Sequence, residues 1–298
     1  YFSTRLIYTE FVSSIYFFMN FLLSKLKNFG TEIIIILGFV FIANQIFYKA
    51  ETPTQSDALG YYDYLPSIFI YHDFVRRNDP VQENPELYNR IKKTGVYVDH
   101  HNYKVNKFAS GTAFLQLPFF TVALLTTHLE GNDHDGYQEP FQKAVLISAF
   151  FYLFLSIFFL KKVLLLYDIK KYIILICQIL LVFGTLVTNY AYFEAGFSHV
   201  YSLFAITAFI YYVKLFCLNK KSSHFIILLI FLGLIFIIRQ MNIFILLFIP
   251  FIAGSFKNIG DSLRFILRDY KTLITGILLC LCVILIQLIP WYLQTGDF

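Results

Sequence analysis

Long apolar runs recur along this chain and restrict it to the α-helical membrane proteins. A bilayer core about 30 Å thick requires about 20 apolar residues per helix, and it offers no water to pair with the backbone. The runs that reach or approach this length are 32–48, 112–128, 144–160, 172–187, 197–216, 225–238, 243–253 and 273–293. We therefore expect an all-α, polytopic helical bundle of about eight membrane segments.

The composition agrees with a lipid environment. Charged residues make up only 14% of the chain and the mean hydropathy is +0.63, whereas a soluble domain carries about 25% charged residues. The net charge of +5 is spread over the loops without a basic tract, so nucleic acid is not an expected partner. The four cysteines lie in or beside apolar runs, where we expect inert thiols rather than disulfides or metal ligands.

The first 30 residues differ from the rest. Three serines and one asparagine interrupt the apolar run 11–26, which favours an interfacial helix, although a true span remains an alternative. Residues 31–298 form the predicted transmembrane domain, with a large loop at 50–111 that carries juxtamembrane helices. Because the chain starts at Tyr1 and stops just beyond an apolar run, we expect it to be the N-terminal portion of a longer protein, truncated at its C-terminus.

Lysines and arginines orient the segments, because they prefer cytoplasmic loops. Basic groups at 25–27, 161–171, 220–221 and 257–271 share one face if each run from the third onward crosses once. The loop 50–111 is then extracytoplasmic. The segment 131–140 is placed on the same side, so the run 112–128 between them cannot be a single crossing. Pro118 in its middle predicts a bent or re-entrant hairpin there. The competing topology places the loop in the cytoplasm, as its own bases favour, and makes 11–26 a span.

Side chains capable of chemistry gather near the segment ends on the expected outer face. The candidate site residues are Asp57, Tyr61, Tyr62, Lys107, Glu139, Glu194, His199 and Arg239. Together they would form a polar cleft at the boundary between water and lipid. Such a cleft suits a substrate with a lipid tail, a phosphate held by Lys or Arg, and a polar head lined by tyrosine and histidine.

Each candidate also has a simpler interpretation when it is taken alone. Asp57 can cap a juxtamembrane helix, and the tyrosines can belong to an interfacial belt. Lys107 and Arg239 can extend to the membrane surface as anchors at helix ends. His199 can donate a hydrogen bond to a neighbouring carbonyl group.

Several segments resemble the integral-membrane glycosyltransferases of the GT-C fold, in particular the group with the protein O-mannosyltransferases and the lipid A aminoarabinose transferases. The resemblance rests first on Asp57 followed by GYYDYLP at 60–66. It also rests on NKFASG leading into LQLPFF at 106–120, and on EAGFSHVYS at 194–202. It covers nearly the whole chain with short motifs, and the His-Pro-Pro signature of many relatives is missing at 107–111.

The resemblance implies transfer of a hexosyl or pentosyl unit from a polyprenyl-phosphate donor to a glycan, lipid or protein acceptor. The reaction would take place on the extracytoplasmic face of a bacterial inner membrane and serve the cell envelope. Asp57 would be the catalytic base, and Lys107 and Arg239 would contact the donor phosphate. Glu194 stands where some relatives place a second acid for acceptor binding or a divalent cation, although the chain shows no clear metal-ligand set.

Two other classes of membrane protein remain open. A transporter or flippase of a lipid-linked substrate would use polar residues inside the membrane as a path, but the middles of the runs are almost uncharged. A non-catalytic scaffold would keep the helical bundle without the reaction. We therefore expect an enzyme, with transport as the alternative.

Overall fold

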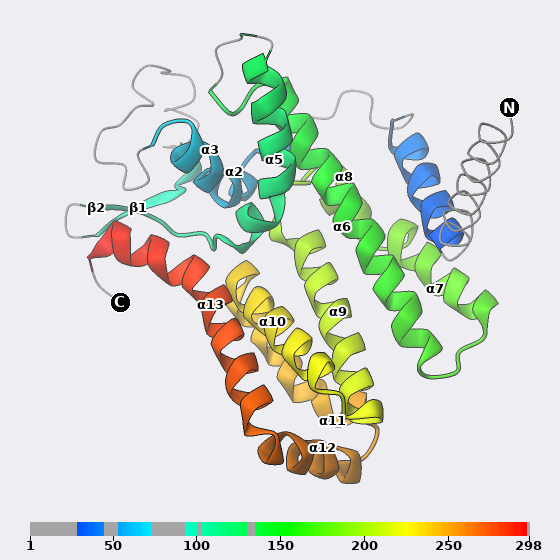
Figure 1. The fold of residues 1–298 in the computed structure, drawn as a ribbon. Helices are drawn as coiled ribbons and strands as arrows, with labels where there is room; N and C mark the ends of the chain where they lie inside the picture. Colours follow the sequence, from blue (N-terminus) through cyan, green and yellow to red (C-terminus); the bar gives the residue numbers. More distant parts are fainter. Residues whose placement is uncertain are drawn as a thin grey trace, which may run out of the picture.

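The computed structural model describes residues 29–44, 53–72, 93–100, 103–129, 131 and 135–296. A first helix, Phe29–Asn44, precedes the labelled elements. These are α2 Asp57–Tyr62, α3 Tyr64–Phe69, β1 Tyr97–His100, β2 Tyr103–Asn106, α5 Gly111–Leu129, α6 Glu139–Leu165, α7 Lys171–Phe183, α8 Val187–Tyr192, α9 Ser198–Asn219, α10 Ser222–Ile238, the 3-10 helix η2 Gln240–Phe248, α11 Ile249–Ala253, α12 Phe256–Arg268 and α13 Tyr270–Thr295 (Figure 1).

Among the described residues, four helices are long and apolar enough to cross a membrane, namely α5, α6, α9 and α13. A fifth span results if the segment from η2 to α12, which bends by 112° before α12, is counted as one crossing. The first helix, α7 and α10 are apolar but shorter. The prediction of an α-helical membrane protein is thus supported. The predicted eight crossings and the extracytoplasmic position of the loop stay predictions.

The predicted interfacial helix at 1–30 lies almost wholly outside the described residues. Of the loop 50–111, the structure describes the short helices α2 and α3 and an antiparallel hairpin of β1 and β2. In this hairpin Tyr97 pairs with Asn106 and Val98 with Val105. The described part of the loop thus contains the two short helices α2 and α3, and their juxtamembrane position stays a prediction.

The bundle is centred on α9 and α10. α10 packs against α9 and α13, and α6 packs against α9 and α5 (Figure 1). Because lipid is as apolar as the side chains, close packing rather than exclusion of water must hold such helices together. Phe209 of α9 and Ile235 of α10 are fully buried at the centre of this packing.

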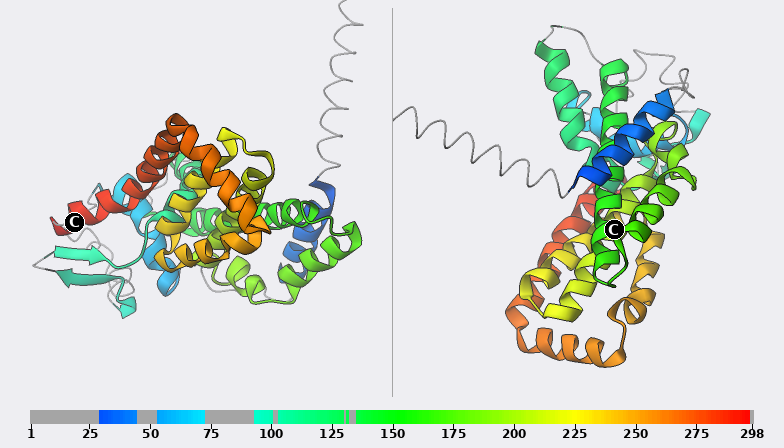
Figure 2. Two further views of the ribbon diagram at one scale, coloured as in Figure 1. Left: turned by 90° about the horizontal axis from the view of Figure 1, so that it is seen from below. Right: turned by 90° about the vertical axis from the view of Figure 1, so that its right-hand side faces the viewer.

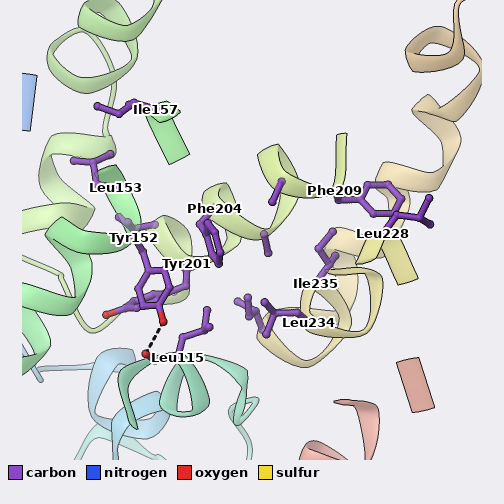
Figure 3. Packing of buried hydrophobic residues seen from close by; sticks show 14 of the residues in the cluster. Leu115, Tyr152, Leu153, Ile157, Tyr201, Phe204, Phe209, Leu228, Leu234 and Ile235 are labelled. Carbon is purple, nitrogen blue, oxygen red and sulfur yellow. Dashed lines mark hydrogen bonds between the residues drawn. The ribbon is translucent and has the colours of Figure 1, made fainter. Parts of the chain in front are cut away.

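Aromatic residues join α5, α6 and α9. The Tyr152 ring centroid lies 5.3 Å from that of Tyr201 and 5.1 Å from that of Phe204. Its hydroxyl donates a 2.9 Å hydrogen bond to the carbonyl oxygen of Leu115, which Figure 3 shows as a dashed line. The first turns of α5 are thereby fixed to both α6 and α9.

The run 112–128 is not the predicted hairpin. It forms one α-helix, α5, with Pro118 inside it. Pro118 is exposed, and a proline removes only one backbone hydrogen bond, so the packing on the other side of α5 can maintain the helix. Figures 1 and 2 show α5 extending beyond the ends of α9 and α10 rather than alongside them, and the sidedness of the loops stays a prediction.

The start of α5 abuts the end of α10. A Cβ atom on Gly111 would lie 2.5 Å from the backbone nitrogen of Ile238, so only glycine permits this approach. The loop helices, the start of α5, the start of α9 and the end of α10 consequently lie at one end of the bundle of α9, α10 and α13 (Figure 1).

A buried ion pair attaches the first helix to the bundle. Glu32 is fully buried, and Lys161 of α6 places its Nζ 2.9 Å from the Glu32 Oε2. The Gln178 side chain of α7 donates a 2.7 Å hydrogen bond to the Glu32 Oε1. A charge in an apolar interior is tolerated when it is paired and hydrogen-bonded in this way.

We expect Glu32→Leu to lower the thermal unfolding midpoint of the detergent-solubilised protein, because it removes the carboxylate that neutralises Lys161. Breaking a fully buried pair costs about 3–5 kcal/mol, and the partial exposure of Lys161 should place the loss near or below the lower value. The double variant Glu32→Leu/Lys161→Met should recover part of the loss. Lys170→Met, at an exposed position, is the control. A single variant as stable as the native protein would contradict this role.

Candidate functional site

Three of the predicted site residues lie at the same end of the bundle although they are far apart in sequence. Asp57 opens α2, His199 lies in the first turn of α9, and Arg239 follows the last residue of α10. The charges of Arg239 and Asp57 both act on the His199 imidazole. Asp57 and Arg239 are exposed and His199 is partly buried. We call these three residues the Asp57–His199–Arg239 group.

The start of α2 is fixed by contacts with α6 and with the turn before α9. The backbone nitrogen and the hydroxyl of Thr54 donate to the Gln142 Oε1 at 3.2 and 2.9 Å. In the turn, a Cβ atom on Gly196 would lie 2.7 Å from the Ala58 Cβ, so glycine permits the contact. Ser56 has a φ of 52°, an unfavourable backbone conformation of the kind that often positions a functional residue.

Asp57 does not cap the helix in the way that its simpler interpretation required. The N-cap residue is Ser56, and no side-chain capping bond is formed. Within the described ranges, the Asp57 carboxylate accepts no hydrogen bond and forms no ion pair. Its place in the first turn of α2 is one where the helix dipole favours negative charge. An exposed carboxylate with unused acceptor atoms can bind a hydroxyl group or remove its proton.

Aromatic stacking holds the His199 ring. Its centroid lies 3.8 Å from the Tyr190 ring centroid, and 6.2 Å from that of Phe197 with an interplanar angle of 13°. In the part of the chain that the structure describes, the ring makes no hydrogen bond, so the expected bond to a carbonyl group is not seen. Tyr190 is not among the residues predicted from the sequence, because it lies on α8 and no sequence periodicity relates it to His199 on α9.

Glu194 lies in the turn between α8 and α9 and is partly buried. Its Oε2 accepts a 2.9 Å hydrogen bond from the Asn189 side chain. The next carbonyl group, that of Ala195, accepts a 3.1 Å bond from the Tyr201 hydroxyl. Tyr201 also bonds Gln116 of α5 at 2.9 Å and Ser148 of α6 at 2.7 Å. This buried network fixes the turn that contacts α2.

Arg239 is placed by the break between α10 and η2. It has an extended backbone, and the next turn is attached to α9 by a 2.9 Å hydrogen bond from Asn242 to the Ser202 hydroxyl. The guanidinium is exposed and forms no ion pair with another described residue. A guanidinium in this state has its full set of donors for a phosphate.

Lys107 and Tyr61 lie at the other end of α2. Asn106 donates a 2.8 Å hydrogen bond to the Gly60 carbonyl oxygen, and the Phe108 ring lies 4.9 Å from the Tyr61 ring. The Lys107 Nζ is exposed and lies 5.2 Å from the Phe108 ring centroid. A six-residue helix is about 9 Å long, so Lys107 borders the same short helix as Asp57 but at its far end.

Two predicted substrate-binding residues do not fit that role. Tyr62 is fully buried, and its hydroxyl donates a 2.5 Å hydrogen bond to the Gly136 carbonyl oxygen. Burial raises the Tyr62 pKa. Glu139 is exposed and forms an ion pair with Lys143 at 2.7 Å, one turn along α6. Tyr62 therefore belongs to the packing of the loop and Glu139 to the surface of α6, and we retain neither as a substrate contact.

Asp63 has a structural role that was not predicted from the sequence. This residue is fully buried and accepts hydrogen bonds from the hydroxyls of Tyr97, Tyr137 and Ser67. It thereby joins α3, β1 and the segment before α6. Both Asp57 and Asp63 lie in the same loop motif, and nothing in their spacing distinguishes an exposed acid from a buried one.

The described site is a carboxylate, an imidazole and a guanidinium at the common end of apolar helices. Among the described residues, no three His, Cys, Asp or Glu side chains form a cluster that could hold a metal ion, and the divalent cation implied by the resemblance stays an untested prediction. No protein-family profile, no curated protein and no solved structure matches this chain.

Proposed function

We propose that this chain is a membrane glycosyltransferase of the GT-C type. It would transfer a hexosyl or pentosyl unit from a polyprenyl-phosphate carrier to an acceptor at the end of the bundle where α2 lies. The observation that carries the proposal is the exposed Asp57 carboxylate, which accepts no hydrogen bond from the described residues and lies at the same end of the bundle as His199 and Arg239.

The reaction would be a single displacement at the anomeric carbon. Asp57 takes the proton of the acceptor hydroxyl while the hydroxyl oxygen attacks the anomeric carbon. The bond between this carbon and the phosphate oxygen of the polyprenyl phosphate breaks. Arg239 stabilises the charge that develops on the departing phosphate through two parallel hydrogen bonds. Lys107 supplies a second cation along α2. Inversion at the anomeric carbon is an expectation from the resemblance.

The remaining candidates have supporting roles in this proposal. Tyr61 of α2 and His199, whose ring stacks on Tyr190, would line the pocket for the sugar. Glu194 would bind the acceptor from the turn before α9. The lipid tail of the donor requires apolar surface next to the site, and α5 provides it, with Phe114 41% and Val122 62% exposed.

Transport of a lipid-linked substrate remains the alternative, and one observation bears on it. The buried cluster of Glu32, Lys161 and Gln178 is the kind of polar group that a transport path uses. However, Glu32 lies in the first turn of its helix and Lys161 near the C-terminal end of α6. These positions at helix ends favour an anchor over a path through the membrane.

The direct test is Asp57→Asn in the full-length protein in liposomes, assayed with a panel of polyprenyl-phosphate sugars and analysis of the products. Loss of the base should lower kcat by about 100-fold or more, while donor binding and the unfolding midpoint stay the same. Asp99→Asn, at an exposed site on β1, is the matched control. Turnover that is unchanged in Asp57→Asn would remove Asp57 from the reaction, absence of product with the native protein would indicate a scaffold, and altered flux of an unmodified lipid would indicate a transporter.

Arg239→Lys should lower kcat/KM for the donor by about 10- to 100-fold, because lysine keeps the charge but cannot bind phosphate through two parallel bonds. The loss should appear with every donor in the panel, since all share the phosphate. Lys143→Gln, which removes a cation from the exposed surface of α6, should have no such effect. An Arg239→Lys enzyme with native kinetics would remove Arg239 from the site.

Labelling of single cysteines tests the orientation. In a variant whose four native cysteines are replaced by alanine, Ser56→Cys should react with an impermeant maleimide on intact cells. Ser223→Cys, at the start of α10, should react only after permeabilisation, because α10 separates the two positions. Both serines are exposed. Labelling of both positions from the same side would contradict the extracytoplasmic assignment of Asp57.

A further inference from the structure

A second polar site lies at the opposite end of the bundle from α2. After η2 and α11 the chain bends by 112° into α12, which lies across the ends of the neighbouring helices (Figures 1 and 2). Beside α12 is a pocket of about 660 Å³. It is lined by Lys220, Asp261, Arg264, Phe265, Arg268 and Asp269.

The side chains of α12 divide into an apolar strip and a basic strip. Phe256, Leu263 and Leu267 are exposed to 82%, 54% and 60%, and a spacing of seven and four residues places them on one face. Arg264 and Arg268 are four residues apart on another face and are also exposed. A helix with this division lies in the plane of a membrane interface, with its apolar side in lipid.

The two carboxylates in the pocket do not neutralise all of its cations. Asp269 caps α13, where it accepts hydrogen bonds from the Thr272 backbone at 3.3 Å and the Ser222 hydroxyl at 2.8 Å. Asp261 contacts Arg264 at only 3.8 Å, and such exposed pairs contribute little. Lys220 and Arg268 form no ion pair with the described residues. The pocket therefore keeps cationic groups for a ligand.

The backbone conformation of Lys220 is a second indication that the pocket binds a ligand. This residue ends α9 in the left-handed conformation with a φ of 49°, which glycine normally adopts at such an end. A lysine there is held against its backbone preference. Its side chain lines the pocket, which gives the position a use that glycine could not serve.

We propose that this pocket binds the phosphate of an anionic phospholipid headgroup. Lys220, Arg264 and Arg268 surround the phosphate, and the acyl chains lie along the apolar strip of α12. The apolar strip beside the cations favours a membrane lipid over a free phosphate ion. The capped state of Asp269 favours an anionic headgroup over one that carries an ammonium. This site is independent of the proposed glycosyl transfer.

Native mass spectrometry of the full chain in detergent tests the site, with phosphatidylglycerol and phosphatidylcholine as probes. The protein should retain phosphatidylglycerol preferentially, and Lys220→Gln/Arg268→Gln should weaken its binding by about fivefold for each charge removed. Lys170→Gln/Lys171→Gln removes two exposed cations outside α12 and the pocket and should bind like the native protein. Equal retention of both lipids, or equal losses in both double variants, would overturn the proposal.

Two further measurements separate the sources of phosphate and the type of headgroup. Millimolar inorganic phosphate should not displace phosphatidylglycerol, and full displacement would identify a free-phosphate site instead. Asp261→Asn should tighten the binding of phosphatidylglycerol, because it removes a carboxylate near the phosphate. Weaker binding in Asp261→Asn would instead indicate recognition of an ammonium. Unfolding midpoints of all variants show that each is folded.

Discussion

The buried hydrogen bonds of Tyr201 determine where the proposed reaction site can form. Its hydroxyl bonds α5 through Gln116, α6 through Ser148, and the turn before α9 through the Ala195 carbonyl group. In an apolar interior an unmade hydrogen bond is costly, so one hydroxyl that satisfies three partners holds all three segments in one arrangement. The turn then contacts Ala58 through Gly196 and so places the start of α2.

The same reasoning explains how the irregular loop is kept at the end of the bundle. Gln287 and Gln294 of α13 are buried, and both accept hydrogen bonds from backbone nitrogens, those of Ser110 and Asn106. Backbone without regular structure near lipid requires such partners, because water is scarce there. The segment that carries Lys107 is thus held by α13. The position of a cation beside α2 depends on glutamines almost 200 residues away in sequence.

The sequence predicted the class of protein better than the local structure of the loop. Apolar length alone indicated a helical membrane protein, and the polar residues at the segment ends indicated eight candidates on one face, which include Asp57, His199 and Arg239. The sequence did not predict which individual loop residues are buried. Tyr61 and Tyr62 are adjacent on α2, yet one borders the surface and the other is buried. That difference depends on Gly136 and Phe120, which no periodicity relates to α2.

The prediction for 112–128 was wrong for a related reason. Pro118 and the parity of the basic loops both indicated a broken segment, since each is a local signal. The structure keeps α5 continuous past Pro118, and in the turn before Pro118 the Leu115 carbonyl oxygen and the Gln116 side chain bond α6 and α9. The position of α5 beyond the ends of α9 and α10 is a tertiary feature that no local pattern contains.

The two proposed sites lie at opposite ends of the same helices, and the length of α9 gives their separation a physical meaning. His199 is in its first turn and Lys220 follows its last, across 22 residues, which corresponds to about 33 Å of helix. This is close to the thickness of the hydrocarbon core. Charges are least costly at the two boundaries of that core, and the middle of α9 carries none between His199 and Lys214. One helix of this length therefore separates Arg239, which we propose binds the donor phosphate, from Lys220, which we propose binds a lipid headgroup, by about the thickness of the hydrocarbon core.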